Sequence, residues 1–217
     1  MKNGIFIVVD GIDGSGKSEL VKMLHNYLYS KHKKFRILTT REPTHGKYGS
    51  KIREMLRKEK DPKASSKKLA ELFIKDREMH LKNTIMPFLK SSGKRELNIV
   101  LCDRYYYSTI AFQGAQGMDM KLLLNKNKIF VKPDIALVLD TEPSIALKRI
   151  ALRQKEKFEK LDFMKRIREN FLKLPNLMND NIKIIDSNRP LNEVFENITS
   201  IFQKRGIRTG LQRRLFL

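Results

Sequence analysis

Eight residues near the start of the chain have the types and spacing of a loop that binds phosphate. They match the pattern G-x-x-x-x-G-K-[ST], and they are Gly11, Ile12, Asp13, Gly14, Ser15, Gly16, Lys17 and Ser18. Glycines let the backbone approach a ligand closely, so that its N–H groups can face phosphate oxygens. The lysine of such a loop reaches the β- and γ-phosphates, and the hydroxyl after it can ligate Mg²⁺. The pattern therefore predicts a chain that binds a nucleoside triphosphate together with Mg²⁺.

The segments on either side of this loop have the apolar patterns of a buried strand and an amphipathic helix. Residues 5–9 are all apolar, as expected of a strand that is buried on both faces. Residues 19–28 repeat apolar side chains at helical spacing, namely Leu20, Met23, Leu24, Tyr27 and Leu28. A strand, a glycine-rich turn and a helix N-terminus bring the positive end of the helix dipole to the phosphates. This context favours a phosphate loop over a chance glycine turn.

Apolar runs and helical segments alternate along the rest of the chain. Strands are expected at residues 5–9, 35–40, 98–102, 135–139 and 182–185, and helical periodicity appears at 52–56, 67–89, from about 107, from 144, from about 161, and through 194–201. The charged, proline-containing segment 58–68 is expected to be a mobile loop. The alternation predicts an α/β fold in three layers, with a five-stranded parallel sheet covered by helices on both faces. Because the sequence contains no internal repeat and no linker segment, we expect one domain over residues 1–217.

Two polar residues follow the third expected strand. Asp103 ends this strand, and Arg104 comes directly after it. An acidic residue at the carboxyl end of a strand beside the phosphate loop is placed to hold hydrated Mg²⁺. The alternative is an aspartate that caps the next helix. The planar guanidinium of Arg104 suits a phosphate.

The charge balance favours anionic partners. The chain has 45 basic and 24 acidic residues, a net charge of +21, which suits nucleotides, nucleic acid or an acidic membrane surface. The alternative is a solvated, lysine-rich surface, because the lysines are spread along the chain. The basic tail, residues 204–217, is compatible with a disordered end, a cap over the substrate or a weak contact to nucleic acid.

The cysteine content and the lengths of the apolar runs indicate where in the cell the chain is expected to be. The single Cys102 cannot form an internal disulfide and ends an apolar run, so we expect a buried small side chain in a reducing cytoplasm. No run of apolar residues is long enough for a membrane span. Because the first expected strand begins at residue 5, we expect no cleavable signal.

Other classes of nucleotide-binding protein fit less well. A GTPase needs an Asn/Thr-Lys-x-Asp motif to read its base, and the nearest string, at residues 125–128, ends in lysine. Motor and helicase ATPases are usually longer chains. An arginine-rich segment after the fourth strand favours phosphoryl transfer between two nucleotides.

Several motifs resemble those of the thymidylate kinase family, in the order of that family. Residues 103–114 read D-R-Y-Y-Y-S-T-I-A-F-Q-G, which is similar to its signature D-R-Y-x-x-S-x-x-A-[YF]-Q-G. Residues 40–43 look like its T-R-E-P loop, with a G-x-x-I-R element at 49–53, and residues 72–80 look like its L-F-x-A-D-R-x-x-H helix. Residues 133–140 resemble its P-D-L-T-L-x-L-D strand, and residues 156–159 its D-R-F-E lid box. The resemblance covers about residues 3–202 and implies a P-loop kinase fold that phosphorylates dTMP to dTDP with ATP and Mg²⁺.

The resemblance also implies roles for individual residues. Asp13 would hold the sugar 3′-hydroxyl, Phe73 would stack on thymine, Arg77 would reach the base edge, and Thr109 and Gln113 would line its other side. Arg104, with Arg41 or Arg53, would hold the monophosphate, and Glu156 and Glu159 would help close the site over sugar and metal. The alternatives are purely structural roles: a core position for Phe73, a surface charge for Arg77 and a helix cap for Thr109. The family further implies a homodimer.

The chain departs from the family pattern at three places. Gly14 stands where one branch of the family has arginine, Phe112 replaces the commoner tyrosine near the sugar, and Thr44 with His45 replaces two glycines. Without arginine in the loop, we expect the catalytic arginine to come from a basic lid at about residues 149–160, with Arg153 the first choice and Arg149 the second. The alternative functions are a sister kinase for UMP or CMP and a P-loop ATPase that binds nucleic acid.

Overall fold

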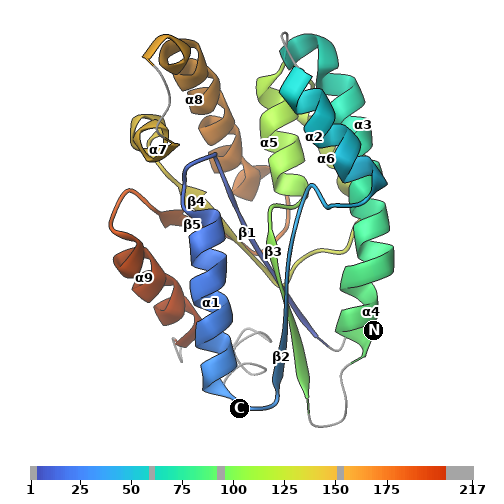
Figure 1. Ribbon diagram of the computed structural model, residues 1–217, viewed down its shortest axis with the longest axis vertical. Coiled ribbons are helices and arrows are strands. Elements are labelled where there is room, and N and C mark those ends of the chain that lie inside the picture. The colour runs from blue at the N-terminus through green and yellow to red at the C-terminus, as the bar shows by residue number, and fades with distance from the viewer. Residues whose placement is uncertain (1–3, 59–61, 92–95, 151–153, 204–217) are drawn as a thin grey trace.

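The computed structural model describes residues 4–58, 62–91, 96–150 and 154–203, and of residues 62–64 and 154–160 it describes the backbone alone. One sheet of parallel strands lies at its centre (Figure 1). In spatial order it contains β2 (Phe35–Arg41), β3 (Leu97–Asp103), β1 (Ile5–Gly11), β4 (Ile135–Asp140) and β5 (Ile182–Asp186). The sequence predicted all five strands within about two residues, and the α/β fold class is confirmed. Strand β1 sits in the middle of the sheet and is buried along its whole length, which explains its continuous apolar run.

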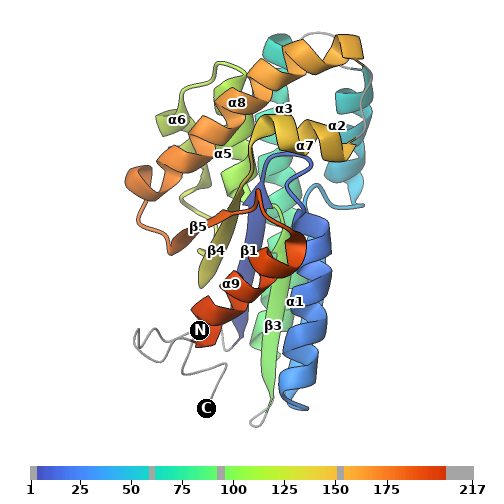
Figure 2. The ribbon, with the colours of Figure 1, turned by 90° about the vertical axis from the view of Figure 1, so that its left-hand side faces the viewer.

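Helices cover both faces of this sheet (Figure 2). One face carries Ile5 and Ile7 of β1, which pack with α1 (Lys17–Lys31) and α9 (Leu191–Gln203). The opposite face carries Phe6 and Val8, which belong to a second apolar cluster. This second cluster is completed by α3 (Pro62–His80), a π-helical turn η1 (Leu81–Ile85), α4 (Met86–Lys90), α5 (Tyr106–Ala115), α6 (Met120–Asn127), α7 (Pro143–Ile150) and α8 (Gln154–Leu177). The three layers expected from the sequence are therefore present.

The expectation of a loop over residues 58–68 is wrong from Pro62 onward. Helix α3 begins at Pro62 and continues through η1 into α4. Proline is compatible with the first turn of a helix, because the N–H groups there have no acceptor within the helix. The helix expected from about residue 161 also begins earlier, at Gln154. Helix α6 was not predicted; its start is marked by Asp119, whose side chain accepts a hydrogen bond of 2.7 Å from the backbone N–H of Lys121.

The carboxyl ends of the strands meet at one edge of the sheet, where the phosphate loop connects β1 to α1. Helices α2 (Lys47–Lys58), α3, α5 and α8 extend beyond this edge (Figure 1). Helix α2 lies so close to the loop after β2 that a Cβ at Gly49 would come within 1.8 Å of the Thr44 carbonyl oxygen. These elements form the walls of the candidate site. Among the helices that the structure describes, none is long and apolar enough to cross a membrane.

Candidate active site

The phosphate loop leaves β1 through backbone conformations that favour glycine. Gly14 has a φ of 77°, and a Cβ at this position would lie 2.4 Å from the carbonyl oxygen of Ala146 in α7. No other residue fits there without displacing α7. This explains the first departure from the family pattern, because an arginine at position 14 is incompatible with the position of α7.

The ammonium group of Lys17 lies beneath the loop rather than in solvent. Its Nζ donates to the carbonyl oxygen of Ile12 at 2.6 Å and lies 3.4 Å from the Ser15 hydroxyl. Burial, reinforced by the nearby positive charge of Arg104, lowers the pKa of Lys17 to about 7. An anion placed against the loop would favour the charged form of Lys17. The loop can therefore couple phosphate binding to protonation of this lysine.

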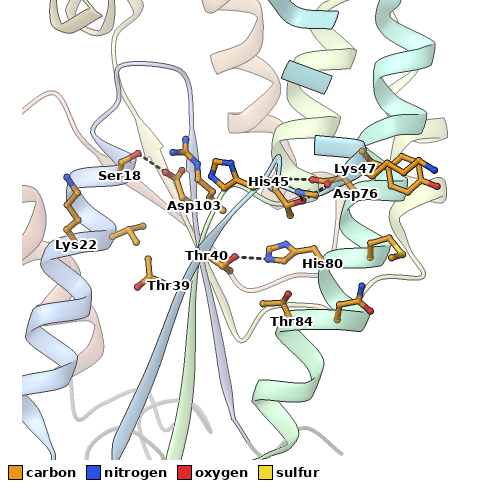
Figure 3. A pocket seen from close by; sticks show the side chains of 17 residues that line it. Ser18, Lys22, Thr39, Thr40, His45, Lys47, Asp76, His80, Thr84 and Asp103 are labelled. Carbon is orange, nitrogen blue, oxygen red and sulfur yellow. Dashed lines mark hydrogen bonds between the residues drawn. The ribbon is translucent and has the colours of Figure 1, made fainter. Parts of the chain in front are cut away.

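Ser18 and Asp103 meet at the start of α1 (Figure 3). The Ser18 hydroxyl donates to Oδ2 of Asp103 at 2.7 Å, and Oδ1 of Asp103 is buried with no hydrogen-bond partner among the described residues. A hydroxyl beside a carboxylate with a free oxygen fits a hard cation such as Mg²⁺. No group of three or more His, Cys, Asp or Glu side chains within the described ranges could hold a metal. A cation here would thus need ligands from a bound nucleotide or water.

Asp10, the last residue before the loop, was not predicted as a site residue. Its carboxylate is fully buried and accepts four hydrogen bonds of 2.6–3.1 Å, from the N–H groups of Gly11, Tyr105 and Ser108 and from the Ser108 hydroxyl. Burial raises its pKa, and the neighbouring Arg104 opposes this shift. Asp10 ties the start of the phosphate loop to the turn between β3 and α5. A carboxyl group at the end of a buried strand was the signal available for this position, as it was for Asp103.

Arg104 lies in the turn that Asp10 holds, with a φ of 71° that is unusual for a residue with a side chain. Its guanidinium donates to the carboxylate of Asp13, to the Gly11 carbonyl at 3.2 Å and to the Ser108 hydroxyl at 3.0 Å. The same group lies over the ring of Phe112, 5.2 Å from its centroid. The structure therefore brings Arg104 and Asp13 together beside the phosphate loop.

A cavity of about 390 Å³ opens next to Arg104. We call it the Phe73 cavity. Six of the predicted residues line it, namely Asp13, Phe73, Arg77, Arg104, Thr109 and Gln113. Its volume suits a small organic ligand. The predicted residues for base and sugar thus converge on one space, although they come from the phosphate loop, α3, α5 and the turn before α5.

Arg77 is completely buried in the wall of this cavity, so the alternative of a surface charge is wrong. Its guanidinium binds Oε2 of Glu42 through Nε at 2.9 Å and Nη2 at 2.7 Å, and Nη2 also donates to Thr109 at 3.0 Å. Nη1 donates to Oδ1 of Asn127 at 2.7 Å. Within the described part of the chain, these bonds engage every N–H of the guanidinium except one on Nη1. One N–H of Arg77, a residue that lines the cavity, therefore has no acceptor in this part of the chain.

Gln113 offers the complementary group from α5. Its Oε1 is buried and has no hydrogen-bond partner among the residues that the structure describes, whereas its Nε2 donates to Oε1 of Gln116 at 3.2 Å. Thr109 and Gln113 are four residues apart, and hence on one face of the helix. Within the described chain, Arg77 and Gln113 thus have unused capacity for one donated and one accepted hydrogen bond.

Two arginines were proposed for the monophosphate beside Arg104, and they lie in different places. Arg41 lines a second cavity of about 850 Å³ beside β2, together with Ser18, Asp103, His45 and Lys47 (Figure 3). Arg53 of α2 donates to the carbonyl oxygen of Pro43 at 3.1 Å, and Pro43 lines the Phe73 cavity. Arg53 thus contacts a residue that lines the Phe73 cavity, whereas Arg41 lines the larger cavity.

The loop after β2 is held by a polar network that sequence reasoning missed. Thr44 binds Asp76 through its backbone N–H at 2.7 Å and its hydroxyl at 2.6 Å. His80 contacts the Thr40 hydroxyl at 2.7 Å (Figure 3). Its other ring nitrogen lies 3.2 Å from Oε1 of Glu42. The threonine that replaces a glycine of the family pattern is therefore a fixed part of this loop.

The predicted lid is described only in part. Arg149, in the last turn of α7, donates from both Nη1 and Nη2 to the carbonyl oxygen of Ser187, at 3.2 Å each. Arg153 lies outside the described residues, and so do the side chains of Glu156 and Glu159. The buried thiol predicted for Cys102 is confirmed, and burial raises its pKa well above the ordinary value.

Comparisons with known proteins agree with this geometry. The family model described as thymidylate kinase matches residues 9–198. A probable thymidylate kinase of Archaeoglobus fulgidus is 36% identical over 92% of this chain and 95% of its own length. A thymidylate kinase of Clostridium novyi is 33% identical over 91% of this chain and 98% of its own length. A third, from Desulfotalea psychrophila, is 40% identical over 76% of this chain and 78% of its own length. The chain belongs to the thymidylate kinase family.

The lowered pKa of Lys17 predicts that nucleotide binding takes up a proton. Because bound phosphate favours the charged lysine, its pKa should rise from about 7 towards the ordinary 10.5. Affinity should then fall as pH rises above 7, by up to about tenfold per pH unit. Calorimetry of ADP binding at pH 8, in buffers of different ionisation enthalpy, measures this uptake. Proton uptake should disappear in Lys17→Met. It should persist in the matched control Lys22→Met on the exposed side of α1. Binding without proton uptake in the parent would contradict the account.

Proposed function

We propose that this member of the thymidylate kinase family transfers the γ-phosphoryl group of ATP to dTMP and so produces dTDP. The observation that carries the proposal is the Phe73 cavity, which opens beside the phosphate loop and Arg104. Donor and acceptor phosphates can therefore meet at the carboxyl edge of the sheet. Cytoplasmic location, which cell fractionation can check, belongs to the same proposal.

The unused hydrogen-bonding capacity at the Phe73 cavity favours thymine or uracil over cytosine as the base. Among the described residues, one N–H of Arg77 has no acceptor and Oε1 of Gln113 has no donor. The edge of thymine carries a carbonyl oxygen next to an N–H, which is the complementary pair. Cytosine presents the opposite pair, an unprotonated ring nitrogen next to an amino group. In this proposal Phe73 stacks on the base, Thr109 lies beside it, and Asp13 binds the 3′-hydroxyl.

On the donor side, the loop N–H groups and Lys17 bind the phosphates of ATP. Ser18 and Asp103 fit Mg²⁺, since one carboxylate oxygen of Asp103 is buried without a partner in the described chain. When bound, Mg²⁺ supplies positive charge to the phosphate oxygens. Glu156 and Glu159 belong to the lid that is proposed to close over the sugar and the metal.

The chain contributes position and charge to the reaction and forms no covalent bond with substrate. Arg104, fixed by Asp13, the Gly11 carbonyl and Ser108, holds the acceptor phosphate, with Arg53 as the second arginine. Lys17 and the loop hold the γ-phosphate in line with it. A closed lid excludes water, which would otherwise accept the phosphoryl group. Direct transfer between the two nucleotides follows from this arrangement.

A panel of nucleoside monophosphates tests the proposed substrate. With ATP and Mg²⁺, a coupled assay of ADP release should give the highest kcat/KM for dTMP, a lower one for dUMP, and the lowest for dCMP, UMP and CMP. Lys17→Met should lose turnover with every acceptor, which excludes a contaminating kinase. Strong stimulation by UMP or CMP with none by dTMP would assign the chain to a different kinase activity.

Replacement of either lid arginine by alanine is expected to lower kcat. The role proposed for Arg153 rests on the sequence. Arg149 is bound to the Ser187 carbonyl, and its other N–H groups have no acceptor among the described residues. An arginine on the transferring phosphoryl group contributes about 10³-fold or more. Arg153→Ala should therefore lower kcat at saturating ATP and dTMP far more than it weakens nucleotide binding, and Arg149→Ala should do so to a smaller extent. With Lys148→Ala as control, values of kcat within about twofold of the parent for both arginine variants would refute the lid assignment.

We also propose that the chain works as a homodimer. The support is its family membership together with the position of β2, a half-exposed strand at the edge of the sheet with the larger cavity beside it. Light scattering at micromolar concentration should return about twice the chain mass of 25.4 kDa. A mass of one chain under these conditions would defeat the proposal.

A further inference from the structure

The end of α5 carries a second glutamine that faces the same cavity as Gln113. Gln116 follows the last residue of this helix as its C-cap, it is 7% exposed, and it lines the Phe73 cavity. Its Oε1 accepts the hydrogen bond from Nε2 of Gln113 at 3.2 Å. No motif used in the sequence analysis includes Gln116.

In the structure, this contact leaves Oε1 of the Gln113 amide without a partner among the described residues. An amide side chain offers a donor on one side and an acceptor on the other, and a rotation of 180° exchanges them. Because Gln116 engages Nε2, the atom without a partner in the described chain is Oε1, an acceptor. A side chain at position 116 that could not accept a hydrogen bond would leave Gln113 free to adopt either orientation.

The orientation matters because the pyrimidine bases differ at ring position 3. Thymine and uracil carry an N–H there, which an acceptor oxygen binds. Cytosine has an unprotonated nitrogen there, which needs a donor. A fixed Gln113 oxygen therefore accepts thymine and uracil and opposes cytosine, since two acceptors facing one another leave both unpaired.

We propose that Gln116 is a positioning residue for base specificity, holding the Gln113 amide so that its oxygen, and not its nitrogen, is available to the base. The inference deepens the proposed function and rests on it, because it assumes that the base occupies the Phe73 cavity. In this proposal Gln116 acts on the base through Gln113. It sets the preference for a base with an N–H at position 3.

Three nucleotides with the same sugar separate this role from a general effect on folding. For the parent and each variant, kcat/KM is measured with dTMP, dUMP and dCMP. Gln116→Met keeps the length of the side chain and removes its acceptor. The dTMP/dCMP ratio should then fall by about tenfold or more. The dTMP/dUMP ratio should stay within about twofold of the parent, because the two bases are identical at position 3.

Gln116→Glu is the matched control. A carboxylate can only accept, so it continues to engage Nε2 of Gln113 and should keep a dTMP/dCMP ratio close to that of the parent. Gln116→Leu is a second variant without a polar group, and a thermal melt shows which variants are folded. One folded apolar variant is sufficient for the test.

The possible outcomes separate the inference from the function beneath it. If the parent enzyme does not prefer dTMP to dCMP, the proposed function fails. If the parent has this preference and a folded apolar variant keeps it unchanged, the role of Gln116 is refuted and the proposed function stands. A loss in Gln116→Glu as large as that in Gln116→Met would also refute the role, because the acceptor would then be irrelevant.

Discussion

The buried guanidinium of Arg77 is the interaction on which the acceptor side of the site depends. It has no exposed surface and is bound by Glu42 after β2, Thr109 of α5 and Asn127 of α6. A buried ion pair adds little net stability, yet removal of one partner costs about 3–5 kcal/mol because the other charge stays buried. The network therefore acts mainly as a constraint on position. It fixes three elements around one cavity, and among the described residues a single N–H of Arg77 has no acceptor.

Asp10 imposes the corresponding constraint between donor and acceptor sides. Its carboxylate binds N–H groups of the phosphate loop and of the turn before α5, and Arg104 stands within that turn. The loop for one phosphate and the arginine for the other are thus attached to the same buried group. Phosphoryl transfer requires the two phosphates in line, and this attachment sets their relative position before any substrate binds.

The fold could be predicted from the sequence because its signals are local. Five apolar runs and one glycine-rich motif gave the sheet and the phosphate loop, and the helical start at Pro62 was missed where charged residues obscured the pattern. The site could be predicted only where the family motifs had assigned roles. Asp10 and Asn127 were missed, because their partners Ser108 and Arg77 are 98 and 50 residues away in the chain. The sequence also could not predict which amide atom of Gln113 is hydrogen-bonded, because this depends on the conformation at the end of α5.

The central claim is that the base is recognised by one free donor on Arg77 and one free acceptor on Gln113. N3-methyl-dTMP tests it directly, because the methyl group removes the N–H that Gln113 would bind and changes neither the sugar nor the phosphate. The account predicts that kcat/KM for this analogue falls by about 10²-fold or more relative to dTMP. It also predicts that dUMP, which lacks only the 5-methyl group, loses less. An analogue as good a substrate as dTMP would contradict the account.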